Sequence, residues 1–266
     1  MRSPFKPTHL LVMVGWVCAA AAHAAIITPT SLGNWSSAPV GGGTTSISGT
    51  FPRSGNGSIE ITLPTDAAGV DWPYQLATPV AFSTFTSGAY EHRRDGLSTI
   101  QSIQAPAYAL LIDNDCNTGT TTDQAYLVYE PYYQTLAAVP SDQWVSETIT
   151  PASLVWPAGG GMPWSSQPLS SYMNGTATGT TIYTSSCIVA VVPFAGSGWV
   201  GAFHGAIDNV RLSAGGTEVV NGNFELSTAP AAAVPVPTLN QWGLGLMVLL
   251  LGALGFQRSR RATSKV

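Results

Sequence analysis

The chain between residues 25 and 226 lacks the pattern that builds amphipathic helices. No run in it keeps apolar residues at a 3.6-residue period, and residues 169–173 suffice for one or two helical turns at most. Short runs rich in Val, Ile, Thr, Tyr and Phe alternate instead with Gly, Pro, Ser, Asn and Asp, which is typical of strands joined by turns. The clearest strand predictions are residues 45–51, 58–63, 80–86, 107–113, 125–129, 144–149, 180–184, 187–194, 199–204 and 206–212.

These strands predict an all-β fold. We find no repeat of about 20 to 50 residues, which disfavours a solenoid or a propeller. About ten strands in roughly 200 residues suit one domain in which two antiparallel sheets pack face to face. We therefore expect a jelly-roll-like antiparallel β-sandwich at residues 25–226, followed by an Ala- and Pro-rich linker at residues 227–236.

The N-terminal 24 residues have the three parts of a secretory signal. Arg2 and Lys6 precede an apolar run at residues 10–22, and the small residues Ala22 and Ala24 form a cleavage pattern. We expect a signal helix that signal peptidase removes after Ala24. The alternative is an uncleaved anchor, but the apolar run is too short to span a bilayer comfortably.

The C-terminus predicts a membrane-retention tail. Residues 239–256 carry no full charge and would extend about 27 Å as a helix at about 1.5 Å per residue, long enough for one transmembrane helix. Because basic residues beside a span stay on the cytoplasmic side, we expect the preceding domain to lie outside the cytoplasm, on the inner membrane. The basic tail at residues 257–266 contains Arg258, Arg260, Arg261 and Lys265.

This tail resembles the IPTL-CTERM sorting domain, a C-terminal signal on exported proteins of Gram-negative bacteria. The resemblance implies that residues 237–266 form a sorting signal, processed by an exosortase-type membrane protease. The alternative is a permanent anchor with an interfacial tryptophan. Five residues match the family pattern, and Val236, Asn240 and Gln241 stand where it has Ile, Ser and Glu; the matching residues are Pro237, Thr238, Leu239, Trp242 and Gly243.

Charge and cysteine usage both fit an exported domain. All 14 acidic residues of the chain lie at residues 25–226 with only four arginines and no lysine, a formal charge of −10. Because phosphate recognition needs Lys and Arg, this balance disfavours nucleic acid and anionic lipid as partners. Cys18 would leave with the signal, so Cys116 and Cys187 are predicted to form a disulfide, which would stabilise the fold by about 4 kcal/mol in the chain-entropy model.

Aromatic residues suggest a polysaccharide-binding surface. Trp156 and Trp164 flank a Gly-rich loop suited to displaying side chains, and indole faces stack on sugar rings. The alternative is that most tryptophans are core residues. The possible ligand-binding residues are Trp144, Trp156, Trp164, Trp199, Tyr132 and Tyr133.

The segment Asp208-Asn209-Val210-Arg211-Leu212 resembles the last core strand of secreted bacterial jelly-roll modules, including carbohydrate-binding modules. Residues 220–225 resemble the opening strand of such modules, yet they follow the closing one. The resemblance implies a sandwich and assigns no activity.

Signatures of metal binding and catalysis are weak. Asp113, Asp115 and Asn117, with Asp123 beyond, have the alternate spacing of a calcium loop, but Thr118 replaces the required Gly and Gln124 the required Glu. We therefore expect a polar turn and no cofactor.

No catalytic residue is predicted, so we expect a non-catalytic protein. The alternative is a glycoside hydrolase, which needs two carboxylates about 5 to 9.5 Å apart. Glu130 with Asp208 or Asp113 could supply such a pair.

Overall fold

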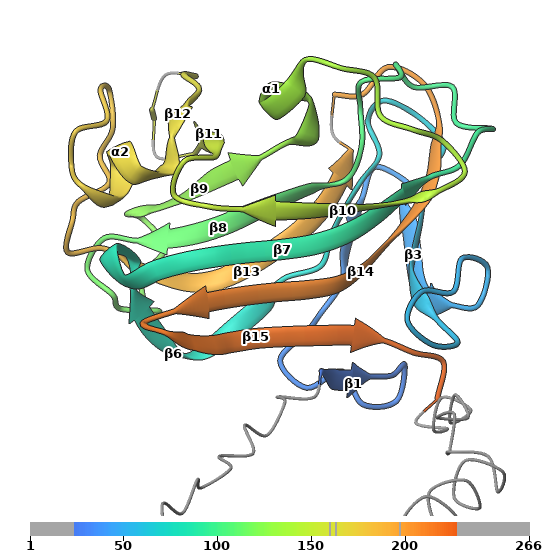
Figure 1. Cartoon of the computed structure of the whole chain (residues 1–266), viewed down its shortest axis with the longest axis horizontal. Helices are drawn as coiled ribbons and strands as arrows, with labels where there is room; N and C mark the ends of the chain where they lie inside the picture. Colours follow the sequence, from blue (N-terminus) through green and yellow to red (C-terminus); the bar gives the residue numbers. More distant parts are fainter. Residues whose placement is uncertain (1–23, 160, 163, 197, 228–266) are drawn as a thin grey trace, which may run out of the picture.

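The structure is a computed structural model that describes residues 24–159, 161–162, 164–196 and 198–227. It contains two β-sheets and only short helices (Figure 1). The predicted signal helix, transmembrane helix, basic tail and sorting signal lie outside the described residues. Within the described part, no helix is long and apolar enough to cross a membrane.

The first sheet has seven strands, built around the long central strand β14 (Phe203–Ala214). On one side β14 pairs with β7, and β10 follows β7. On the other side it pairs with β4 at one end and with β15 at the other. All pairs are antiparallel except β1 with β15. The remaining strands are β1 (Ala25–Ile27), β3 (Thr44–Ser48), β4 (Ser58–Leu63), β7 (Phe85–Arg94), β10 (Trp144–Ile149) and β15 (Thr217–Phe224).

The second sheet has eight strands in the order β12-β11-β9-β8-β13-β5-β2, with β6 also paired to β13. Its strands are β2 (Ala38–Val40), β5 (Gly69–Asp71), β6 (Tyr74–Ala81), β8 (Ala107–Asp113), β9 (Gln124–Tyr129), β11 (Leu154–Ala158), β12 (Gln167–Pro168) and β13 (Cys187–Gly196). Three short helical segments join strands: η1 (Phe82–Thr84), α1 (Pro131–Thr135) and α2 (Leu169–Met173).

The eight-stranded sheet is apolar on both faces. Side chains alternate along a strand, so Tyr108, Leu110 and Ile112 of β8 point into the main core between the sheets. The intervening Ala107 and Leu111 belong to a second buried cluster on the outer face. Trp156, Ala158 and Phe194 pack against this outer cluster. The outer face therefore supports aromatic side chains on a rigid base.

Several predicted elements agree with the structure. The strands at residues 58–63, 107–113 and 144–149 and the helical turns at residues 169–173 have the predicted bounds. The strands predicted at residues 199–204 and 206–212 instead form one strand, β14, that runs through Gly205. A Cβ at Gly205 would overlap the carbonyl oxygen of Arg93 and the ring of Phe203, so the glycine permits close packing and does not end the strand.

Two strand predictions are wrong for local reasons. Residues 180–184 form no strand, because the amide of Ile182 donates to the hydroxyl of Thr180 and the amide of Tyr183 to that of Ser186. These short bonds replace ladder partners. Residues 80–86 are divided by η1, whose Phe82 amide donates to the carbonyl of Ser186.

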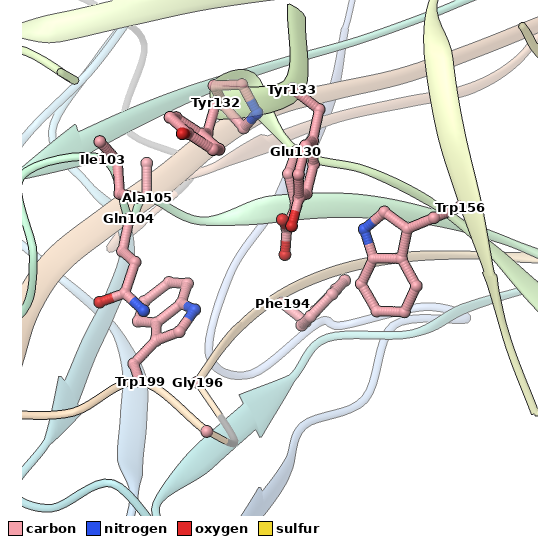
Figure 2. A pocket seen from close by; sticks show the side chains of 12 residues that line it. Ile103, Gln104, Ala105, Glu130, Tyr132, Tyr133, Trp156, Phe194, Gly196 and Trp199 are labelled. Carbon is pink, nitrogen blue, oxygen red and sulfur yellow. The ribbon is translucent and has the colours of Figure 1, made fainter. Parts of the chain in front are cut away.

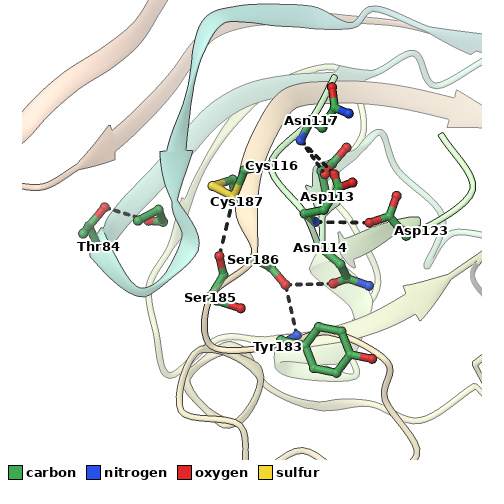
Figure 3. Close-up of a disulfide and its surroundings, with 12 residues drawn as sticks. Thr84, Asp113, Asn114, Cys116, Asn117, Asp123, Tyr183, Ser185, Ser186 and Cys187 are labelled. Atoms are coloured by element: carbon green, nitrogen blue, oxygen red, sulfur yellow. Dashed lines mark hydrogen bonds between the residues drawn. A yellow bond between two sulfur atoms is a disulfide. The ribbon is translucent and has the colours of Figure 1, made fainter. Parts of the chain in front are cut away.

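The predicted disulfide is confirmed: Cys116 is bonded to Cys187, with 5.2 Å between their Cα atoms (Figure 3). Cys187 opens β13 directly opposite Asp113, the last residue of β8. The bond therefore ties the loop after β8 to the start of the neighbouring strand, over a sequence separation of 71 residues.

Candidate ligand-binding cleft

A cavity of about 290 Å³ opens where strands of the eight-stranded sheet end beside α1 (Figure 2). β11, β13, α1 and Glu130, the residue after β9, contribute to it, and two loops close the sides. We call this cavity the cleft. Its lining residues are Ile103, Gln104, Ala105, Glu130, Pro131, Tyr132, Tyr133, Trp156, Phe194, Gly196, Gly198 and Trp199.

Glu130 owes its position to the end of β9. Tyr129 points into the core and Val128 to the outer face, so alternation turns Glu130 to the outer face as well. Pro131 then starts α1, because its fixed φ suits the first helical position. Burial raises the pKa of the Glu130 carboxyl above its ordinary range. A hydrogen-bond donor or a cation in the cleft would therefore stabilise the charged form of Glu130.

The indole of Trp156 faces this carboxyl group. Figure 2 shows the Trp156 nitrogen turned toward Glu130. The N–H offsets part of the rise in the Glu130 pKa, although the two groups do not reach the geometry of a hydrogen bond. The indole nitrogen is buried and has no other partner among the described residues. A ligand or water oxygen between the two groups would satisfy both.

The tyrosines of α1, Tyr132 and Tyr133, form another wall of the cleft. The ring centroids of Tyr132 and Tyr133 are 5.4 Å apart, and Trp164 lies 5.7 Å from Tyr133. The side chain of Gln134 holds this short helix in place: its amide nitrogen donates to the carbonyls of Glu130 and Leu154, and its oxygen accepts from the Leu154 amide at 3.0 Å. α1 is thereby fixed to β11, the strand that carries Trp156.

The structure brings together four of the six predicted ligand-binding residues. Trp156, Trp199, Tyr132 and Tyr133 all line the cleft. Trp164 is not among the lining residues, but it packs on Tyr133 and is 60% exposed. The sixth predicted residue, Trp144, does not line the cleft.

Trp144 lies on β10 of the seven-stranded sheet, where the guanidinium of Arg53 sits 5.9 Å from its ring centre. It belongs to a different surface from the cleft. Sequence reasoning also missed Gln104 and Phe194, whose neighbourhood carries no pattern that marks a site. Gly196 and Gly198 could have been found, because glycines close before an aromatic residue, here Trp199, can let a ligand approach the backbone.

The structure does not form the carboxylate pairs suggested for hydrolysis. Tyr129 is opposite Tyr108 and Gln124 is opposite Asp113, so Glu130 and Asp113 lie at opposite ends of β8 and β9. Six residue positions separate them, about 20 Å at about 3.3 Å per residue. Asp208 is on the other sheet, on the side of β14 away from core residue Ile207. The separation of Glu130 from Asp113 exceeds what hydrolysis requires, and Asp208 is not among the residues that line the cleft with Glu130.

Three carboxylates meet near the disulfide (Figure 3). One oxygen of each of Asp113, Asp115 and Asp123 lies within 4.8 Å of the others. Amides of the same loop already bond them: Asn117 donates to Asp113 and Asp115, and Asp115 donates to Asp123. The side-chain oxygen of Asn117 accepts from Gly119 and is not directed at the carboxylates. This is the bonding of a polar turn.

Comparison with solved structures finds similar architectures at low identity. A family 11 carbohydrate-binding module from Clostridium thermocellum, solved with a β-1,3-1,4-mixed-linked tetrasaccharide, is 16% identical with a TM-score of 0.41, covering 72% of this chain and 91% of that one. A xylan-binding domain from family 22 is 14% identical with a TM-score of 0.35, covering 76% and 99%. The xylan-binding CBM22-2 domain of Paenibacillus barcinonensis Xyn10C is 10% identical with a TM-score of 0.36, covering 69% and 92%.

No curated protein matches the chain. Residues 234–261 match the model of the IPTL-CTERM motif, which includes the Pro-Thr-Leu segment, the apolar run and the arginines singled out from the sequence. The match confirms the resemblance on which the sorting prediction rests. At its C-terminus, this chain carries an IPTL-CTERM motif.

Proposed function

We propose that this chain is an exported, non-catalytic surface protein whose β-sandwich binds a glycan in the cleft. The observation that supports this most directly is the lining of the cleft: Trp156, Trp199, Tyr132 and Tyr133 stand around Glu130. Sugar rings have apolar C–H faces that stack on aromatic rings and hydroxyl rims that need hydrogen-bond partners. The cleft offers both in one place.

The size and stiffness of the cleft suit a small part of a longer glycan. Its volume of about 290 Å³ is near the lower end of the usual range for ligand pockets, roughly 300 to 1,000 Å³. The bonds of Gln134 fix α1, and the outer apolar cluster supports Trp156 and Phe194, so little order has to be gained on binding. We propose that one or two sugar units occupy it.

The C-terminal motif supports a location at the cell envelope. In this proposal signal peptidase removes residues 1–24, and residues 237–266 hold the protein at the inner membrane until an exosortase-type protease processes them. The amide of Glu225 donates to the carbonyl of Ile27 at 2.8 Å, so both ends of the sandwich leave it at one edge. Figure 1 shows this edge at the bottom and α1 at the top, so the cleft would face away from the membrane.

A matched pair of tryptophan variants tests the binding site. The full-length protein, in detergent where needed, would be titrated with neutral, acidic and amine-bearing glycans while tryptophan fluorescence is recorded. We expect Trp156→Ala to weaken binding of the best glycan at least about fivefold, because a stacked aromatic contributes about 1 to 3 kcal/mol. Trp144→Ala removes the same side chain from the other sheet and should leave the affinity unchanged. Equal losses in both variants, or no binding by any glycan class, would contradict the proposal.

A glycoside hydrolase is the second candidate, favoured by one observation. Glu130 is a carboxyl group whose pKa is raised by burial beside a tryptophan, which is the environment of a general acid. The cleft lining contains no second carboxylate to act with it. Release of reducing ends from any bound glycan, abolished by Glu130→Gln, would establish this candidate in place of the first.

A further inference from the structure

The charge in the cleft has one sign. Among the described residues that line it, Glu130 is the only carboxylic acid, and none is Arg, Lys or His. No basic side chain among the described residues lies within salt-bridge distance of Glu130. An anionic sugar in this cleft would meet an uncompensated carboxylate and find no cation to neutralise it.

The arginines of the domain are held elsewhere. Arg53 bonds Glu91 through two nitrogens at 2.7 Å, and Arg93 reaches Asp142. Arg94 is buried and donates to Ser141 and to the carbonyls of Ser98 and Ile100, whereas Arg211 lies near Glu218. Residues 25–226 contain no lysine, and each of their four arginines has the partners named above, so no lysine or arginine side chain neutralises Glu130.

The walls of the cleft are suited to a cation. Tyrosine and tryptophan faces attract ammonium groups through the negative potential of their rings, most strongly where water is excluded. Trp156, Trp199, Tyr132 and Tyr133 surround the position of Glu130, whose carboxylate can pair directly with such a group. The formal charge of −10 over residues 25–226 would also attract a polycation from a distance.

We propose that the glycan bound in the cleft carries free amino groups, and that its ammonium is held between Glu130 and the aromatic rings. This inference rests on the proposed glycan binding and narrows it to amino sugars that are not acetylated. A neutral sugar would stack equally well and its hydroxyls could donate to Glu130, but it would bring no positive charge to pair with the carboxylate. A uronic acid or a sulfated sugar would be repelled.

Oligosaccharides that differ only at the amine test this inference. β-1,4-linked glucosamine oligomers, their fully N-acetylated counterparts of the same length and the matching glucose oligomers would be titrated into the full-length protein by calorimetry, slightly below neutral pH. We expect the glucosamine oligomer to bind at least about tenfold more tightly than the other two, the ratio that one partly buried charged contact supplies. Of the three oligomers, only the glucosamine oligomer should lose affinity steeply as salt is added.

The variants Glu130→Gln and Glu218→Gln separate local from overall charge. Glu218 lies on β15 of the other sheet, outside the cleft lining, and each variant removes one negative charge. Glu130→Gln should abolish the preference for the amine while the acetylated oligomer still binds. Glu218→Gln should keep the preference.

The outcomes distinguish this inference from the function on which it rests. Equal affinity for the three oligomers, or a preference that survives Glu130→Gln, would overturn the amino-sugar assignment and leave glycan binding intact. Binding of oligolysine as tight as that of the glucosamine oligomer would overturn it too, because the site would then recognise charge without sugar. Absence of binding by every oligomer and by every other glycan tested would remove the proposed function itself.

Discussion

Glu130 and Asp208 are two carboxyl groups withdrawn from water, and only Glu130 faces a cavity. Asp208 is fully buried in β14, where one oxygen accepts from the Phe224 amide at 2.9 Å. Its other oxygen has no partner among the described residues. Burial raises the pKa of Asp208 to about 8, and the nearby charges of Glu225 and Glu91 add to this rise. An acid held in this way makes the stability of the fold depend on pH.

The sign of that dependence follows from proton binding. Between the ordinary value of 3.8 and about 8, folded Asp208 keeps a proton that the unfolded chain has lost. The contribution of Asp208 to stability is therefore fully present below about pH 4 and decreases as pH rises, by roughly 1.4 kcal/mol per unit, until pH is about 8. Asp208→Asn should raise the melting temperature at about pH 9 and change it little at about pH 4.

Calorimetric melting across this pH range measures the effect. Asp66→Asn is the control, because it removes the same charge from an exposed side chain. If Asp208→Asn and Asp66→Asn shift the melting temperature equally at every pH, Asp208 is not the buried acid described.

At the scale of single elements, α1 is the part of the cleft that depends on one side chain. It has only five residues, too few to be stable alone, and no side-chain cap bonds its first turn. Gln134 compensates with three bonds, two of them to the backbone of Leu154. The positions of Tyr132 and Tyr133 relative to Trp156 therefore depend on Gln134.

Gln134→Ala tests this dependence without any ligand. Hydrogen exchange at the amides of residues 132–136 should accelerate, and stability should fall by about 1 to 3 kcal/mol, because buried backbone groups lose their partners. Gln167→Ala is a close match, since Gln167 makes a similar pair of bonds to Thr178 at 3.1 and 3.0 Å, away from the cleft. Unchanged exchange at residues 132–136 in Gln134→Ala would show that α1 is held by other contacts.

Element by element, the sequence patterns predicted the strands that have clear breaks at both ends. β4, β8 and β10 are such strands, as is the short helix α2. β7 was missed because polar residues of the seven-stranded sheet, such as Glu91 and Arg93, dilute its pattern and are satisfied only by partners far along the chain. Gly205 suggested a turn, because its close approach to the carbonyl of Arg93 on β7 depends on tertiary structure that the local sequence does not reveal.

The site was predictable only as a set of residue types. Aromatic residues beside Gly-rich segments indicated Trp156 and Trp199, and both line the cleft, although Trp199 is also buried against Phe203 of the core. Nothing local could separate Trp144 from them, since that depends on which sheet β10 joins. Glu130 was noticed as a possible catalytic acid, but the carboxylate proposed to act with it, Asp113, lies too far away. That distance is set by the register of β8 and β9, which the sequence alone does not reveal.

For the whole molecule, the arrangement of the cleft and the chain ends relates binding to location. The parallel pair β1 with β15 closes one edge of the sandwich and brings residues 25–27 beside residues 222–224. The IPTL-CTERM motif at residues 234–261 comes after that edge in the sequence. In the proposed function, a domain tethered through this motif would present the cleft to the surroundings of the cell.

The central claim, that a glycan occupies the cleft, is tested most directly by a crystal structure of the protein with the tightest-binding oligosaccharide. We expect a sugar ring stacked on Trp156, with a polar group of the sugar in contact with the carboxylate of Glu130 and with Tyr132 and Tyr133 on its other side. Well-defined sugar on any other surface, for example beside Trp144, with the cleft filled only by water, would contradict the claim.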